Sequence, residues 1–527
     1  MGYTVNMISP YLMSRRQLLR LAGATGAAML LPSCAHHLPL DKRAVPDFGD
    51  ASRPFLGLAT SLREEHDYEA VVEGDLPVGL RGTLYRNGPG LFDRGGLRKR
   101  HLIDGDGMLQ AFRFHHKVVR YRNRFVRTQK FLEEQSAGRF TRPTWSTQAP
   151  GGWTANFWRA GDIISQAGIS AVYRNGKLYA FDESSLPYEA DPETLETIGE
   201  TTFGLPRDLS MYSGHPKLDP QTGEWLHFGI LHGPSPAIHL TIFKPDGSLR
   251  EHRSLPMPRY VYMHDWFATS RHLIIALQPM EIKVWGFLFG FRSLAESLRW
   301  NGDEGTLLMI LDRHAPEEPL LLETEAWYMW HSINAVSAGE EIVADFVGYR
   351  EPDHLVGNDP YVSAVMEGRK GEYRWPGEVR RYSIDLSKKR VTQEAIHQGR
   401  CEWPRINDRY LFAPCRYVYL ANSRPDEFFW SAVSRLDLYE GKEERFQFPA
   451  GVYCCEPNFV ELPGTRNTPD SRMAPGWVLS EIYDSGTRKS SLAIFDAEHM
   501  SSGPVAMVRL SHHVPFSYHG WWRPAGC

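Results

Sequence analysis

The sequence predicts an all-β fold of the β-propeller type, on the basis of three observations. After about residue 45, short runs of alternating hydrophobic and polar residues recur, each ended by Gly, Pro, Asn or Asp, which is typical of strands and turns. Few segments in this region have the periodicity of a long amphipathic helix. Hydrophobic residues make up 42% and aromatic residues 12% of the 527-residue chain, which is typical of a globular protein with a large core.

Hairpins are predicted where a hydrophobic strand is followed by an Asp at or near a turn. An Asp side chain can accept hydrogen bonds from the backbone of its own turn, which explains its use there. The segments with this pattern are residues 177–200, 237–255, 306–323, 378–395, 432–448 and 491–510.

Hairpins spread over about 450 residues indicate blades around an axis, because each blade of a propeller packs only on its neighbours and leaves only short edges. A double β-sandwich is the main alternative. We expect one domain over residues 51–527. The C-terminal stretch HVPFSYHGWW, which contains His519, is explained if terminal strands meet to close the ring.

Residues 1–34 are predicted to be an export signal of the twin-arginine type. Arg15 and Arg16 precede an apolar run that ends near Leu31 and is too short to span a bilayer stably. The sequence LLPSC resembles a lipoprotein cleavage box at Cys34, so a lipid anchor is left open beside a plain N-terminal anchor or a start at Met13. We expect a linker over 35–50 and a protein exported folded to the periplasm.

Composition and cysteine spacing exclude some classes of site. The formal net charge is −4 and no basic stripe is interleaved with aromatic residues, so nucleic acid is not an expected partner. The six cysteines contain no CxxC pair and match no zinc spacing, so most are expected to be buried as small hydrophobes.

Residues 283–300, KVWGFLFGFRSLAESLRW, break the strand pattern. If helical, the segment places Trp285 and Phe289 on one side. It could then bind a membrane interface or line a substrate entrance, and core packing is the equal alternative.

Histidines and glutamates in apolar surroundings are candidates for a metal site. Neutral imidazole binds borderline divalent metals, and a carboxylate that accepts the other ring N–H fixes the tautomer and offsets the metal charge. The histidines are His215, His264, His331 and His519. The acids are Glu183, Glu402 and Glu456, each in a setting where an unpaired carboxylate would be costly.

Ten motifs occur in the order YRNGPG, HLIDGDGML, YRNRFVRT, GHPKLDP, MHDWFATS, HSINA, CEWPRIN, CEPNFV, IFDAEHM and VPFSYHGWW. Together they resemble the carotenoid cleavage oxygenase family from about Gly79 to Pro524. The resemblance implies a seven-bladed propeller, with capping loops and short helices over one axial non-haem Fe(II). It places the iron ligands at the four histidines above and the outer carboxylates at the three glutamates. It also implies the pairs Glu183 with His264, Glu402 with His331 and Glu456 with His519, and it gives His101 no ligand role.

The resemblance further implies oxidative cleavage of a C=C bond by dioxygen, giving two carbonyl products, with no acid or base residue at the reacting carbons. A carotenoid or apocarotenoid is the expected substrate, in an apolar tunnel. A hydroxystilbene, as in lignostilbene dioxygenases, is the alternative, and its hydroxyl would need a polar partner such as Lys130, although a surface position is expected for that lysine. Two rivals are a membrane-tethered binding propeller without catalysis and a four-histidine zinc hydrolase. The zinc hydrolase is weakened by the lack of a GxSxG elbow.

Overall fold

The computed structural model describes residues 50, 52–159, 164–183, 185–232, 235–315, 317–464 and 475–526. The predicted export signal with Cys34, and the linker except for Asp50, lie outside the described residues, so both stay predictions.

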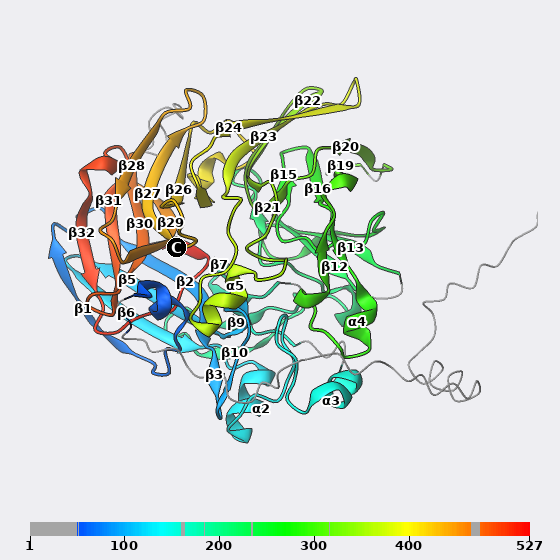
Figure 1. The fold of residues 1–527 in the computed structure, drawn as a ribbon. Helices are drawn as coiled ribbons and strands as arrows, with labels where there is room; N and C mark the ends of the chain where they lie inside the picture. Colours follow the sequence, from blue (N-terminus) through cyan, green and yellow to red (C-terminus); the bar gives the residue numbers. More distant parts are fainter. Residues whose placement is uncertain are drawn as a thin grey trace, which may run out of the picture.

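Five separate four-stranded antiparallel sheets make up most of the fold (Figure 1). The first contains β7 (Ser170–Arg174), β8 (Lys177–Phe181), β9 (Tyr188–Ala190) and β10 (Thr197–Glu200). The second contains β11 (Lys217–Leu218), β12 (Trp225–Leu231), β13 (Ala237–Phe243) and β14 (Leu249–Pro256). The third contains β15 (Phe267–Ala268), β16 (His272–Leu277), β19 (Thr306–Asp312) and β20 (Leu320–Thr324). The fourth contains β21 (Tyr328–Ala338), β22 (Glu341–Tyr349), β23 (Glu378–Asp385) and β24 (Arg390–His397). The fifth contains β25 (Cys401–Arg405), β26 (Tyr417–Ser423), β27 (Trp430–Asp437) and β28 (Glu443–Gln447).

A nine-stranded sheet joins the two ends of the described chain. Its strands, in spatial order, are β29 (Val452–Glu461), β30 (Gly476–Asp484), β31 (Lys489–Asp496), β32 (Pro504–Arg509), β1 (Asp67–Gly74), β6 (Val118–Phe125), β5 (Asp106–His115), β2 (Gly82–Leu91) and β33 (Gly520–Pro524). Figure 1 shows its blue N-terminal strands beside the red and orange C-terminal strands. The predicted all-β, propeller-like fold is thus found, while the number of seven blades stays a prediction.

Smaller elements fill the connections between these strands. They are the ribbons β3 (Asp93–Arg94) with β4 (Leu97–Arg98) and β17 (Met280–Ile282) with β18 (Leu298–Trp300), and the helices α2 (Gln129–Ala137), α3 (Gly152–Arg159), α4 (Val284–Leu288) and α5 (Tyr361–Ala364). The 3₁₀ helices are η1 (Pro54–Ala59), η2 (Leu102–Asp104), η3 (Arg207–Leu209), η4 (Ala295–Ser297), η5 (Gly302–Glu304), η6 (Val365–Glu367), η7 (Asp408–Tyr410) and η9 (Met500–Ser502). No helix in the described ranges is both long and apolar enough to cross a membrane.

Burial falls from the middle of each sheet toward its last strand. Every residue of β16 is buried, whereas β24 alternates between exposed and half-buried positions. The central strands are covered on both faces because neighbouring sheets pack against them, so they are hydrophobic without alternation. The predicted role of the turn aspartates is confirmed: Asp437 Oδ1 accepts hydrogen bonds from the backbone of Tyr439 and Glu440 at 3.0 and 3.1 Å.

The two ends of the chain meet twice. β1 pairs with β32 through Val71 opposite Arg509, and β33 pairs with β2 through Trp521 opposite Tyr85. The second pairing places His519 one residue before β33, where its carbonyl accepts the backbone N–H of Asn87 at 3.1 Å. The terminal strands therefore close the sheet system and hold His519 in the interior, in agreement with the expectation for the C-terminal stretch.

Arg86 fastens this closure from within. Its side chain is completely buried, and its Nε lies 3.2 Å from Glu481 Oε2. The guanidinium also donates to Ser517 Oγ at 3.0 Å and to the Tyr518 carbonyl at 2.9 Å. One cation on β2 therefore binds both β30 and the segment that leads into His519.

We expect Arg86→Met to lower the free energy of unfolding by about 3–5 kcal/mol, because Glu481 would remain buried without its cation. Chemical denaturation measures this change. The control is Arg120→Met, whose exposed ion pair with Asp67 should contribute less than about 1 kcal/mol. Equal losses in the two variants would show that Arg86 does not fasten the closure.

Candidate metal centre

The candidate residues lie on strands at the edges of different sheets. Four of the separate sheets begin with β11, β15, β21 and β25, and in each of them this first strand lies at the edge of the sheet. In the nine-stranded sheet, β29 lies at an edge. These edges meet, since β15 contacts β21, β21 contacts β25, β25 contacts β29, and β29 contacts β33. His215 and His264 precede β11 and β15, His331 lies in β21, and His519 precedes β33. Segments far apart in the sequence are thereby brought to one place.

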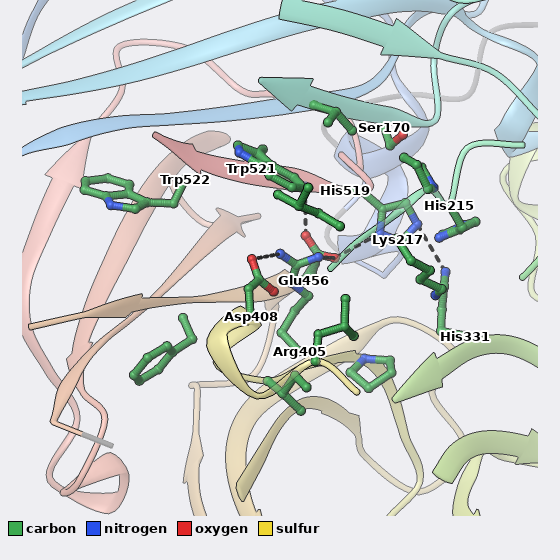
Figure 2. A pocket seen from close by; sticks show the side chains of 18 of the residues that line it. Ser170, His215, Lys217, His331, Arg405, Asp408, Glu456, His519, Trp521 and Trp522 are labelled. Carbon is green, nitrogen blue, oxygen red and sulfur yellow. Dashed lines mark hydrogen bonds and ion pairs between the residues drawn. The ribbon is translucent and has the colours of Figure 1, made fainter. Parts of the chain in front are cut away.

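The four predicted histidines converge. One ring nitrogen from each of His215, His264, His331 and His519 lies within 4.8 Å of the others. The Nε2 atoms of His215 and His264 are 2.9 Å apart, and those of His331 and His519 are 3.1 Å apart. Three of the rings are buried and His215 is half-buried. Figure 2 shows three of them pointing toward one another at the end of a pocket.

Each of the three glutamates contacts the histidine with which the family resemblance pairs it. Glu183 Oε1 lies 2.6 Å from His264 Nδ1, and Glu402 Oε2 lies 2.5 Å from His331 Nδ1. Glu456 Oε1 lies 2.9 Å from His519 Nδ1. An ionised carboxylate can only accept, so each of these rings carries its proton on Nδ1 and presents a lone pair at Nε2.

Further hydrogen bonds hold two of these carboxylates in place. Glu183 Oε1 also accepts the hydroxyl of Tyr262 at 2.6 Å. Glu456 Oε2 accepts the backbone N–H of Gly520 at 2.8 Å and the side-chain N–H of Asn458 at 2.7 Å. A Cβ at Gly520 would lie 2.4 Å from Asn458 Oδ1, so only glycine allows this close contact next to His519.

Burial keeps three of the rings, those of His215, His331 and His519, uncharged. Desolvation lowers the pKa of His331 to about 3 and that of His519 to about 4, and it holds the pKa of His215 well below its ordinary value. Burial also raises the pKa of Glu402 to about 8, an effect that a nearby metal cation would oppose. In contrast, Arg405 and His519 stabilise the charge of Glu456 and lower the pKa of that carboxyl despite its burial.

This donor set fits a divalent transition metal. With both carboxylates ionised, His331 and His519 have no proton between their Nε2 atoms, so two lone pairs face each other at 3.1 Å. A cation between them removes this repulsion. Two imidazole nitrogens at about 2.1 Å from one metal and at right angles lie about 3.0 Å apart, close to both Nε2–Nε2 distances. Neutral nitrogen donors suit iron, zinc, copper and nickel, so the geometry supports a metal without naming it.

Among the described residues, no carboxylate contacts His215, and a hydrogen-bonded network lies beside it instead. Lys217 Nζ donates to Asp265 Oδ1 and to Ser332 Oγ, both at 2.8 Å. Ser332 in turn donates from its backbone N–H and its hydroxyl to Asp265 Oδ2, both at 2.7 Å. Since these residues follow His215, His264 and His331 by one or two positions, the network ties three ligand-bearing segments together. Sequence analysis did not identify it, although Lys217 and Asp265 stand inside two of the quoted motifs.

Two cavities reach the histidines. The larger, about 540 Å³, is polar near the centre, where Lys217, Arg405 and Asp408 line it, as Figure 2 shows. The smaller, about 60 Å³, has an apolar, largely aromatic lining. His331, His519 and Trp403 border both cavities. The histidine cluster therefore lies between a wide cavity of mixed polarity and a narrow apolar one.

Trp403 occupies this boundary in an unusual backbone conformation. Its φ is 58°, in the left-handed region that a bulky residue rarely adopts. Its ring lies 4.9 Å from that of His331 and is stacked on Tyr518 at 5.8 Å. Its backbone N–H donates to Glu402 Oε2. The conformation thus aims the indole and the carboxylate at the same histidine, which no sequence pattern indicated.

Other predicted candidates lie apart from the histidine cluster. Lys130, expected at the surface, is completely buried on α2, 2.5 Å from Asp106 and 2.8 Å from Glu134, so that expectation is wrong. Two carboxylates accept hydrogen bonds from its ammonium group, and Lys130 lines neither of the two cavities that reach the histidines. His101 is buried outside the cluster, and its Nδ1 accepts the N–H of Ile103 at 3.1 Å.

The cysteines agree with the expectation of small hydrophobes. Of the described cysteines, Cys401, Cys454 and Cys455 are buried, Cys415 is half-buried, and all four are free thiols. None of them belongs to the histidine cluster.

Comparison with known proteins finds extensive similarity. The sequence profile of the family described as retinal pigment epithelial membrane protein matches residues 59–524. The apocarotenoid-15,15'-oxygenase of Synechocystis sp. is 29% identical over 88% of this chain and 94% of its own length. The lignostilbene-alpha,beta-dioxygenase isozyme III of Sphingomonas paucimobilis is 26% identical over 89% of this chain and 96% of its own. The crystal structure of the cobalt-substituted Synechocystis apocarotenoid oxygenase superposes with a TM-score of 0.83 at 28% identity, covering 90% of this chain and 98% of that one.

We expect His331→Ala to lower metal affinity by at least about a hundredfold while the fold is kept, because the variant loses one of four donors. Metal content after anaerobic loading with Fe(II) measures the loss, and circular dichroism monitors the fold. His232→Ala, an exposed histidine outside the cluster, is the control. Full metal content in His331→Ala would remove His331 from the ligand set.

Proposed function

The chain belongs to the retinal pigment epithelial membrane protein family, the carotenoid cleavage oxygenase family of the sequence resemblance, and from this premise we propose that it is a non-haem Fe(II) dioxygenase. The proposed reaction adds the two atoms of O2 across one C=C bond, R–CH=CH–R′ + O2 → R–CHO + R′–CHO. The observation that carries the proposal is the convergence of four imidazole nitrogens, three backed by glutamate, at the end of an apolar cavity.

His215, His264, His331 and His519 would hold the iron. When bound, the metal would supply the redox chemistry with O2, which closed-shell side chains lack. The three glutamates keep the ring protons on Nδ1 and offset the metal charge. No other acid or base is required at the reacting carbons, because both products leave as carbonyl compounds without a net proton transfer.

The remaining residues orient the alkene and exclude water. The apolar cavity presents Trp330, Trp403, Phe516 and Tyr518 around the histidines, so an apolar alkene is favoured there and bulk water is not. The cavity is narrow, so a substrate must displace some of these side chains as it enters. Holding one double bond beside the metal is then the main contribution of the protein.

We favour a carotenoid or apocarotenoid substrate. Support comes from the apolar, aromatic lining and from the similarity to an apocarotenoid oxygenase. A hydroxystilbene is the second candidate, supported by similarity to a lignostilbene dioxygenase at nearly the same identity.

We also propose seven blades and one exported catalytic domain over residues 51–527. The nine-stranded sheet supports the count of seven. It contains two sets of four strands, β29–β32 and β1, β6, β5, β2, which join only where β1 pairs with β32. These two sets and the five separate sheets make seven blades. Arg15 and Arg16 in the predicted signal support export of the folded protein to the periplasm. Lipidation at Cys34 is included in this proposal as an anchor to the membrane.

A surface of exposed aromatic side chains supports contact with a membrane. Within residues 283–300 the only α-helix is α4, so the helix is much shorter than the whole segment. Trp285 on α4 is 55% exposed. On α3, Trp158 is 64% exposed. The two helices are joined by packing of Phe157 on Phe289 at 6.3 Å and of Trp153 on Phe291 at 5.8 Å. Exposed indoles favour the membrane interface, where an apolar substrate is dissolved.

We expect the double variant Trp158→Glu, Trp285→Glu to bind vesicles of mixed neutral and anionic phospholipid at least about tenfold more weakly than the parent. Co-sedimentation measures binding. Tyr439→Glu is the control, because Tyr439 is 65% exposed away from this surface. An unchanged bound fraction in the double variant would exclude the surface as the membrane contact.

The function is tested with iron-loaded protein lacking residues 1–34 and with isotopically labelled dioxygen. The panel contains apocarotenals, carotenes and hydroxystilbenes, and mass spectrometry identifies the aldehydes. We expect both products to carry label, and their masses to identify the bond that is cut.

Metal analysis of the same preparation separates the rivals. About one iron per chain supports the enzyme, and no retained iron supports the binding propeller. Bound iron with no product from any substrate would mean an unusual substrate or a binding role. A zinc-loaded protein with hydrolytic activity would favour the zinc hydrolase. His331→Ala should give no aldehyde.

A further inference from the structure

The apolar cavity contains one imidazole that does not belong to the histidine cluster. His354 borders the cavity together with His264 and His331, and it is only 1% exposed. It lies in the loop between β22 and α5, and its ring is 4.6 Å from that of Tyr349 and 5.7 Å from that of Phe428. The proposed metal chemistry gives this residue no role.

The tautomer of His354 follows from its one side-chain hydrogen bond. Trp330 Nε1 lies 2.7 Å from His354 Nε2, and an indole N–H can only donate. Nε2 is therefore an acceptor, and the proton of the neutral ring lies on Nδ1. Burial lowers the pKa of His354 to about 3, which keeps the ring neutral.

The Nδ1–H of His354 has no acceptor among the described residues, although the atom is buried. Two other groups of the same lining share this property, the Nε1–H of Trp403 and of Trp430. A buried donor without an acceptor is costly, and this lining contains three such donors beside a single unpaired acceptor, Glu402 Oε1. The missing acceptor is expected to come from whatever occupies the cavity.

We propose that His354 is a specificity-determining residue that donates a hydrogen bond from Nδ1 to an oxygen atom of the substrate. The chain then takes an oxygen-bearing alkene, a carbonyl or hydroxyl compound, in preference to a hydrocarbon of the same shape. A hydrocarbon leaves the Nδ1–H unpaired, and a site built to pair a polar group discriminates strongly against a ligand that lacks it. This inference rests on the proposed function, because it assigns the apolar cavity to the alkene.

Binding in the absence of dioxygen tests the inference separately from turnover. The iron-loaded protein is titrated anaerobically with two matched pairs, and quenching of tryptophan fluorescence gives each Kd. The pairs are an apocarotenal with the polyene that carries a methyl group in place of its aldehyde, and hydroxystilbene with stilbene. We expect the oxygen-bearing member of at least one pair to bind about tenfold more tightly. The pair that shows the preference identifies the source of the oxygen.

Three variants at one position locate the donor. His354→Asn keeps an N–H near the place of Nδ1 and should keep most of the preference. His354→Gln places its N–H near Nε2 instead, and His354→Phe has none, so both should bind the two members of the pair equally. The Asn and Gln side chains are both polar and similar in size, so a difference in binding preference between His354→Asn and His354→Gln does not arise from loss of the fold. Metal content monitors the fold in each variant.

Equal binding of both members by the parent protein, or an unchanged preference in both His354→Gln and His354→Phe, would overturn the inference. The proposed function is judged by labelled aldehydes alone. A protein that cleaves both members of a pair without a binding preference therefore refutes the role of His354 and leaves the dioxygenase intact. A protein that keeps the His354-dependent preference but forms no aldehyde refutes the dioxygenase.

Discussion

Two imidazole nitrogens, Nε2 of His331 and Nε2 of His519, face each other at 3.1 Å in the middle of this protein, and their lone pairs repel unless a cation lies between them. This constraint explains much of the surrounding structure. Glu183, Glu402 and Glu456 hold the ring protons away from the centre, and hydrogen bonds from Tyr262 and Gly520 hold two of the carboxylates. The glutamates in turn are carried by strands or strand ends of different sheets, so the centre is formed only when those edges meet.

The four-histidine centre lies between two cavities with different linings. On one side lies a wide cavity with charged and apolar residues in its lining, among them Lys217, Arg405 and Asp408, and on the other, aromatic rings give a narrow apolar one. Trp403 separates the two, and its left-handed backbone shows that the chain accepts local strain to place an indole there. The histidines are thus reached by two cavities that differ in width and in lining.

Sequence patterns and the family resemblance predicted different parts of this structure. Local chemistry predicted the turns, because an Asp such as Asp437 caps the backbone a few residues away. The metal-site positions came from the resemblance, since each candidate histidine alone is as well explained by packing. Lys130 was misjudged because its i,i+4 spacing to Glu134 does not tell whether the pair is buried, and because its contact with Asp106 joins two separate elements. The pairing of β1 with β32 and the orphaned Nδ1 of His354 depend on contacts between distant segments, which a single sequence does not display.

The distribution of the four histidines has a practical consequence for handling the protein. Because His215 and His519 are separated by about 300 residues and His519 is held where β33 returns to β2, no isolated sheet or fragment contains the set. On the proposed metal binding, the ratio of tightly held metal to polypeptide in a fully loaded preparation would report the fraction of chains in which all four segments have come together.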